Sequence, residues 1–167
     1  RGGRRIYDNL RKAMGYICAV HVPIAGLALL PIVAGWPLLL TPLLIALLEL
    51  IIDPACSVIL EAEPEERGIM RRPPRARDSS LLPRRLLAWC LVQGVAALAV
   101  VAAVYLVAAR SSMSGEAVRT QVFAALVGAN LALILVNRTY ESSLRATFGR
   151  PNKMLWWGLG IAIAVLG

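Results

Sequence analysis

The sequence predicts an all-α protein, a polytopic bundle of about five transmembrane helices, the last of them incomplete. Hydrophobic residues make up 58% of the 167-residue chain, and they gather in several runs of about 20 residues, the length of a helix that crosses a bilayer. Basic residues are concentrated between these runs. A soluble domain of this size does not need such long apolar runs, so we expect an integral membrane protein whose immediate partner is the lipid bilayer.

The first part of the chain, residues 1–15, is predicted to be a basic helix in which Ile6, Leu10, Ala13 and Met14 share one face. This helix is expected to run directly into a first membrane span at about residues 16–36. The uncharged turn Gly35-Trp36-Pro37 then leads into a second span at about residues 38–60. Residues 16–60 are therefore predicted to form a transmembrane hairpin.

Residues 61–85 are predicted to form a polar cytoplasmic loop, and residues 86–167 to hold the further transmembrane helices. The third span, at about residues 86–109, carries Gly94 among alanine and valine, a composition that suits close helix packing. The fourth span covers about residues 120–136. A fifth begins near Leu155 and is incomplete, and we expect both ends of the sequence to belong to a longer protein.

The distribution of positive charge predicts the orientation of the chain. The N-terminal segment and the loops after the second and fourth spans hold 5, 7 and 4 Lys or Arg residues, whereas the turn at Gly35 holds none and the loop after the third span, with its border, holds 2. Cytoplasmic loops are the basic ones. We therefore expect a multi-pass plasma-membrane protein with a cytoplasmic N-terminus. The net charge of +8 is explained by topology, and no nucleic acid partner is expected.

The candidate site is centred on two carboxylates in the second span, Glu49 and Asp53. A charge at the middle of a bilayer costs roughly 2.5 to 3.5 kcal/mol on insertion scales, so acids at that depth usually have a function. Four residues apart, the two share one face of a helix. Pro54 removes a backbone donor and is expected to break the helix, which frees carbonyl oxygens. This arrangement suits a dehydrated cation, and a structural acid pair is the alternative.

Two neutral side chains are further candidates for this metal site. His21 is the one histidine of the chain and lies near membrane depth beside Pro23. It could serve as a ligand, as a proton-exchanging group, or simply as a residue that hydrogen-bonds within the fold. Asn130 lies inside the fourth span, where its amide can donate to another helix or offer its oxygen to a cation.

The residues of this chain do not predict a site for covalent catalysis. The loops carry no Ser/His/Asp set, no glycine-rich phosphate loop and no Cys-x-x-Cys motif, so no catalytic or cofactor-binding residue is predicted. The three cysteines, Cys18, Cys56 and Cys90, have no metal-ligand spacing, and we interpret them as small buried hydrophobic residues.

Several segments resemble P-type cation ATPases of the calcium and sodium pump class, in particular their bacterial members. Residues 3–13 (GRRIYDNLRKA) look like the stalk that enters the fifth membrane helix, and residues 20–31 (VHVPIAGLALLP) are similar to the helix itself. Residues 48–54 (LELIIDP) resemble the ion motif of the sixth helix, and residues 70–75 (MRRPPR) the loop after it. The resemblance covers nearly the whole chain.

This resemblance implies an ATP-driven pump whose actuator, phosphorylation and nucleotide-binding domains, with their ATP and magnesium, lie in a missing N-terminal part. Whether this chain by itself is an enzyme stays open. Asp53 matches the aspartate that bridges the family's ions. Glu49 and His21 fall where calcium pumps have asparagines. Ile24 falls where they have a glutamate, and Asn130 falls where one class of calcium pump has a glutamate in the eighth helix. Calcium is then the most plausible transported cation, with another divalent ion or proton counter-transport as alternatives.

The sequence therefore favours the membrane part of a cation pump, with Glu49, Asp53, His21 and Asn130 as the cation ligands. A proton-coupled secondary cation transporter could use the same acids without any ATP-handling domain. A non-transporting membrane scaffold would use them only to hold helices together. An ATP-handling domain upstream in the complete gene would distinguish the pump from the secondary transporter. The scaffold predicts that Glu49→Gln and Asp53→Asn change the association of helices and have no effect on ion transport.

Overall fold

The structure is a computed structural model of the chain. It describes residues 2–61, 81–138 and 160, and for residues 51–57 it describes the backbone alone. The described residues contain helices and no strand, which confirms the all-α class. The helices are α1 (Gly2–Ala34), α2 (Pro42–Glu61), α3 (Arg84–Ala109) and α4 (Gly115–Asn137). Most of the loop predicted at residues 61–85, and the fifth span predicted from Leu155, lie outside the described residues.

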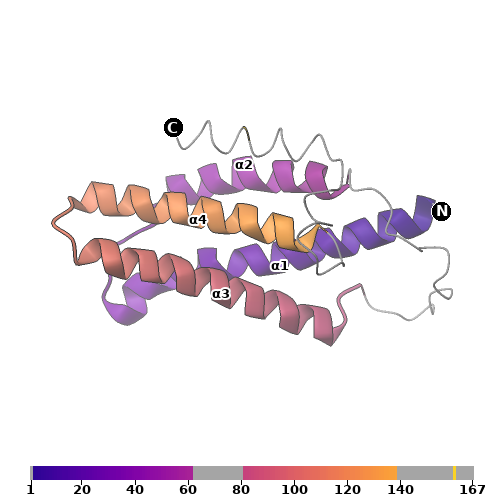
Figure 1. Ribbon diagram of the computed structural model, residues 1–167, viewed down its shortest axis with the longest axis horizontal. Helices are drawn as coiled ribbons and strands as arrows, with labels where there is room; N and C mark the ends of the chain where they lie inside the picture. The colour runs from indigo at the N-terminus through magenta and orange to yellow at the C-terminus, as the bar shows by residue number, and fades with distance from the viewer. Residues whose placement is uncertain (1, 62–80, 139–159, 161–167) are drawn as a thin grey trace.

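The four helices lie side by side in an elongated bundle (Figure 1). α1 and α3 run in one direction along the bundle, and α2 and α4 run in the other. The connections between α1 and α2 and between α3 and α4 are at one end, and the N-terminus is at the opposite end. The chain therefore crosses the length of the bundle with each helix, as expected for successive membrane spans.

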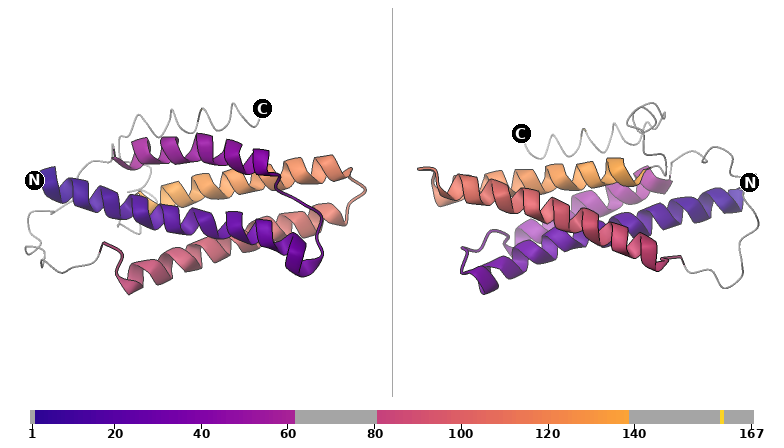
Figure 2. Two further views of the ribbon diagram at one scale, coloured as in Figure 1. Left: turned by 180° about the vertical axis from the view of Figure 1, so that it is seen from behind. Right: turned by 60° about the horizontal axis from the view of Figure 1, so that its bottom comes forward.

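α1 joins the predicted basic helix and the first span into one helix of 33 residues, about 50 Å long at 1.5 Å per residue. Its N-terminal part projects beyond the other helices (Figure 2). Pro23 and Pro31 lie inside α1. Because proline has no N–H, the carbonyl groups four residues earlier, those of Ala19 and Leu27, lack their usual helical donor.

The backbone of α2 remains α-helical through Pro54. The expectation that Pro54 breaks this helix is therefore wrong. Proline removes one hydrogen bond from a helix, and the remaining bonds can hold the helix together on either side. In a bilayer this outcome is favoured, since an unwound segment would expose several backbone groups that water cannot reach.

Both short connections end in a side-chain cap. The backbone N–H of Leu44 donates to the hydroxyl oxygen of Thr41 (3.3 Å), and the N–H of Ala117 donates to the hydroxyl oxygen of Ser114 (3.3 Å). Such caps satisfy backbone donors that have no partner inside the helix. They explain why α2 and α4 each begin directly after a residue with a hydroxyl group.

The turn between α1 and α2 uses glycine and an aromatic contact. Gly35 has a φ of 66°, a left-handed conformation that glycine adopts without steric cost. Trp36 then packs on Tyr105 of α3, with ring centroids 4.2 Å apart and an angle of 38° between the rings. This contact ties the turn that follows α1 to the C-terminal part of α3.

Glycines allow α1 and α3 to form the most extensive helix contact among the described residues. A methyl carbon at Gly94 would lie 2.6 Å from the carbonyl oxygen of Ala19 and 2.6 Å from Cβ of Val22. A methyl carbon at Gly26 would overlap with the side chain of Leu98. The prediction of close packing at Gly94 is therefore confirmed. The carbonyl that Gly94 approaches is the one that Pro23 leaves without its helical donor.

A polar pair connects α3 and α4. The side-chain amide of Asn137 donates to the side-chain oxygen of Gln93 (2.9 Å) and to the carbonyl of Leu133 (2.8 Å). Away from water, hydrogen bonds of this kind help membrane helices to associate.

Substitution of either partner by leucine is expected to lower the free energy of unfolding by about 1 kcal/mol, because a partly buried polar group then loses its partner. A double-mutant cycle of Gln93→Leu and Asn137→Leu, followed by thermal unfolding in detergent, measures the coupling energy. We expect about 0.6 kcal/mol, the typical value for such pairs in membrane proteins. A coupling energy of zero would show that the bond does not contribute to stability.

Three of the described helices, α1, α3 and α4, are long and apolar enough to cross a membrane. α2 has 20 residues, which corresponds to about 30 Å and is close to the thickness of the hydrocarbon core. Apolar side chains such as Ile32, Leu43 and Val107 are exposed on the outside of the described bundle, as is usual for helices in a bilayer. The chain is therefore a multi-pass membrane protein.

Candidate cation site

His21 lies on α1 with an exposed side chain. Its Nδ1 is 2.8 Å from the carbonyl oxygen of Ile17, one turn earlier. A carbonyl oxygen can only accept, so in this hydrogen bond Nδ1 carries the proton. In the neutral ring the lone pair is then on Nε2, and this atom is available to a cation or a proton.

Glu49 and Asp53 lie one turn apart in the continuous helix α2. The Glu49 side chain is exposed on the surface of the bundle, and the Asp53 side chain lies outside the described residues. The backbone therefore preserves the spacing on which the prediction of a carboxylate pair depends.

Asn130 of α4 has a fully buried side chain, with an exposed fraction of 0%. Neither its amide nitrogen nor its amide oxygen has a hydrogen-bond partner among the described residues. An unpaired buried polar group of this kind costs about 1–3 kcal/mol, which is unusual for a residue with a purely structural role. Of the predicted site residues with a described side chain, Asn130 alone is inside the bundle.

The described side chains do not form a complete metal site. Within residues 2–50, 58–61 and 81–138, no group of three or more His, Cys, Asp or Glu side chains could hold a metal ion. His21 and Glu49 are exposed, whereas Asn130 is buried. The four-residue ligand set that includes Asp53 stays a prediction.

The N-terminal part of α1 buries its polar residues. Asp8, Asn9 and Lys12 are buried, whereas the apolar Ile6 is 64% exposed. The side-chain amide of Asn9 donates to the carbonyl of Glu61 at the end of α2 (3.1 Å). This bond satisfies a carbonyl that has no partner within its own helix, and it links the segment predicted as a stalk to the helix that carries the acids. Sequence periodicity emphasised the apolar face and gave no signal for this contact.

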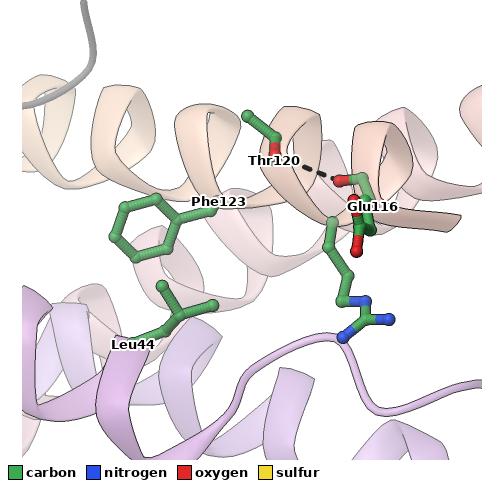
Figure 3. Close-up of a pocket in the computed structure, with 5 residues that line it drawn as sticks. Leu44, Glu116, Thr120 and Phe123 are labelled. Atoms are coloured by element: carbon green, nitrogen blue, oxygen red, sulfur yellow. Dashed lines mark hydrogen bonds between the residues drawn. The ribbon is translucent and has the colours of Figure 1, made fainter.

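A shallow cavity of about 220 Å³ lies between the first turns of α2 and α4 (Figure 3). Leu44 and Phe123 form its apolar side (Figure 3), and Glu116, Arg119 and Thr120 also line it. The Thr120 hydroxyl donates to the backbone carbonyl of Glu116 (3.0 Å), so part of the polar lining is already paired. The three predicted cation ligands with described side chains, His21, Glu49 and Asn130, do not line this cavity.

These features define a class of protein: a multi-pass helical membrane protein with ionisable and amide groups at membrane depth, as proteins that handle ions have. Residues 37–167 match the family described as "Cation transporting ATPase, C-terminus". The chain belongs to this family, which confirms the resemblance to P-type cation ATPases.

Individual relatives include pumps for different cations. The calcium-transporting ATPase of Bacillus subtilis (strain 168) is 30% identical over 142 residues, which are 84% of this chain and 16% of that protein. The sodium/potassium-transporting ATPase subunits alpha-3 of Gallus gallus and alpha-1 of Anguilla anguilla are each 36% identical over 86 residues, which are 51% of this chain and 8% of those proteins. The chain therefore spans a small part of the length of these relatives.

Proposed function

We propose that the chain is the membrane part of an ATP-driven cation pump, which binds and moves its cation through carboxylates inside the membrane. The observation that carries this proposal is the position of Glu49 and Asp53, one turn apart in a helix of membrane-spanning length within the stretch that matches the family. Asp53 and Glu49 are the charged ligands. Asn130 offers its amide oxygen, and His21 its Nε2 atom.

The unpaired amide of Asn130 supports its role as a ligand. Its oxygen has no hydrogen-bond partner among the described residues, and a carbonyl-type oxygen is a suitable ligand for a hard cation. Occupation by a cation would compensate the cost of burying this group.

Calcium is the proposed cargo. Two carboxylates together with an amide oxygen suit a divalent hard cation, and a calcium-transporting ATPase is among the relatives. The sodium/potassium-transporting relatives make a monovalent cation the alternative. Glu49 or His21 would carry a counter-transported proton, because both side chains are exposed on the bundle and both can change their protonation state.

The rest of the pump follows from the same proposal. The N-terminus of α1 faces the cytoplasm at the plasma membrane, and residues 1–15 act as a stalk. ATP and magnesium bind in the actuator, phosphorylation and nucleotide-binding domains, which are the partners of this chain. The hydrogen bond from Asn9 to the carbonyl of Glu61 (3.1 Å) would transmit movement of the stalk to the end of α2.

Transport by the protein expressed from its complete gene tests the proposal. ATP-dependent uptake of calcium, manganese and magnesium is measured in inverted vesicles for the wild type and for Asp53→Asn. We expect uptake of calcium, and a reduction of at least about 100-fold in the variant, because loss of a charge-assisted contact of about 3 kcal/mol corresponds to this factor.

Glu116→Gln is the matched control, because Glu116 is an exposed acid that lines the separate cavity, and it should leave uptake unchanged. Uptake that survives Asp53→Asn would exclude Asp53 as an essential ligand and favour a structural acid pair. Uptake that needs a proton gradient and no ATP would favour the secondary transporter, and no ion uptake in any form would favour the scaffold.

A further inference from the structure

The cavity between α2 and α4 has a polar part and an apolar part. Glu116, Arg119 and Thr120 line it from the first two turns of α4. Phe123 lies one turn further along α4, and Leu44 of α2 faces it (Figure 3). The polar residues are exposed, whereas the two apolar residues are half-buried. The cavity therefore combines charged groups near the end of α4 with apolar contacts further along the bundle.

The cavity is expected to lie at the level of the lipid headgroups. It is near the connections between the helices, at the end of the bundle opposite to the N-terminus (Figure 1). α4 has 23 residues, about 35 Å, which is more than the roughly 30 Å of the hydrocarbon core. Its first turn, with Glu116, therefore reaches the headgroup region. Phe123 lies two turns later, about 10 Å deeper, at the level of the acyl chains.

The charges of the cavity complement those of a zwitterionic headgroup. Glu116 and Arg119 are three residues apart on one helix, and side chains at this spacing have Cβ atoms about 5–6 Å apart. A zwitterionic headgroup carries a phosphate and an ammonium group joined by two carbons. A guanidinium group binds phosphate well, and a carboxylate accepts hydrogen bonds from an ammonium group.

Thr120 can contribute one further acceptor. Its hydroxyl proton is donated to the backbone carbonyl of Glu116 (3.0 Å), and a hydroxyl oxygen that donates its proton can still accept hydrogen bonds. The polar part of the cavity thus offers one cationic donor group, on Arg119, and acceptor oxygens on Glu116 and Thr120.

We infer that this cavity binds the headgroup of one phosphatidylethanolamine molecule. Arg119 holds the phosphate, Glu116 and Thr120 accept hydrogen bonds from the ammonium group, and the acyl chains leave along Leu44 and Phe123. The volume of about 220 Å³ is below the roughly 300–1,000 Å³ of pockets that enclose a drug-sized ligand. It therefore suits a headgroup and not a whole lipid.

Hydrogen bonding and charge select this lipid among the common phospholipids. Phosphatidylcholine has the same phosphate, but its trimethylated nitrogen has no N–H to donate to Glu116. Phosphatidylglycerol has no cationic group, so its phosphate would lie near the Glu116 carboxylate without a compensating charge. The described cation ligands do not line the cavity, so this inference does not depend on the proposed function, and loss of the headgroup leaves those ligands in place.

The test is native mass spectrometry of the complete protein in detergent. Phosphatidylethanolamine, phosphatidylcholine and phosphatidylglycerol with identical acyl chains are titrated separately. We expect the wild type to retain one phosphatidylethanolamine molecule at about tenfold lower lipid concentration than either of the other two, a factor that corresponds to 1.4 kcal/mol.

Four variants identify the site. Arg119→Gln should weaken the binding of phosphatidylethanolamine and phosphatidylcholine alike, whereas Glu116→Gln should remove the preference between them. Leu44→Trp should fill the cavity and abolish binding while it keeps both charges. Arg110→Gln is the matched control, because Arg110 is an exposed arginine in the connection between α3 and α4 that does not line the cavity, and it should bind lipid as the wild type does.

Thermal unfolding in detergent shows that the compared variants are folded. Arg119→Gln and Glu116→Gln replace exposed side chains, so they should unfold at nearly the wild-type temperature. Equal binding of the three lipids by the wild type, or stronger binding of phosphatidylglycerol, would overturn the inference. A folded Glu116→Gln variant that keeps the preference for phosphatidylethanolamine would overturn it as well.

Discussion

Replacement of Gly94 by leucine is expected to prevent stable assembly of α1 with α3. Even the first carbon of a side chain at this position would lie 2.6 Å from the carbonyl oxygen of Ala19. This oxygen belongs to the backbone and cannot turn away, so the helices must separate. Overpacking of this kind costs about 3 kcal/mol or more, and we expect thermal unfolding in detergent at a much lower temperature than for the wild type.

Gly128→Leu is the matched control for this prediction. Gly128 lies inside α4, and a methyl carbon there would meet no atom of the described residues within 4 Å. The same substitution should therefore change the free energy of unfolding by no more than about 0.5 kcal/mol. Equal unfolding temperatures for Gly94→Leu and Gly128→Leu would show that the close contact between α1 and α3 does not stabilise the bundle.

Replacement of Asn130 by leucine is expected to raise stability and to reduce transport. The substitution removes two buried polar atoms that have no partner among the described residues, and this should raise the free energy of unfolding by about 1–3 kcal/mol. If the amide oxygen binds the cation, ATP-dependent uptake should fall at least about tenfold, which corresponds to 1.4 kcal/mol of lost binding. Thermal unfolding and vesicle uptake measure the two effects separately.

Asn137→Leu on the same helix is the control, and its expected effects on stability and transport are the opposite of those of Asn130→Leu. Asn137 donates two hydrogen bonds, to Gln93 and to the carbonyl of Leu133, so its removal should lower stability. Uptake per folded molecule should be close to that of the wild type. A variant Asn130→Leu with unchanged uptake would remove Asn130 from the ligand set, and lower stability in this variant would show that its amide has a structural partner.

The membrane helices were largely predictable because the physical signal is local. Each span needs about 20 consecutive apolar residues, and the spans predicted at residues 86–109 and 120–136 correspond to α3 (Arg84–Ala109) and α4 (Gly115–Asn137). The continuity of α1 was also predicted. The break expected at Pro54 is wrong, because the low-polarity surroundings favour a helix that loses one bond over a segment that loses several.

The residue types of the candidate site could be predicted from the sequence, whereas the burial and arrangement of their side chains could not. Residue type and spacing single out Glu49, Asp53, His21 and Asn130, since polar groups at membrane depth are costly. Sequence could not distinguish the buried Asn130 from the exposed His21 and Glu49. Which side of a helix faces its neighbours depends on all of them together, and an apolar lipid environment weakens the periodic pattern that reveals this side in soluble proteins.

The sequence by itself determined that this is a helical membrane protein, where its helices lie, and the family to which it belongs, because apolar length and short motifs are properties of adjacent residues. Only the tertiary structure decided which residues meet across helices. It brought the backbone of Ala19 against Gly94 and Cys90 against Gly15, joined Asn9 to the end of α2, and left the amide of Asn130 without a partner among the described residues. These contacts join residues that are distant along the chain, and their energies depend on how closely whole helices approach each other.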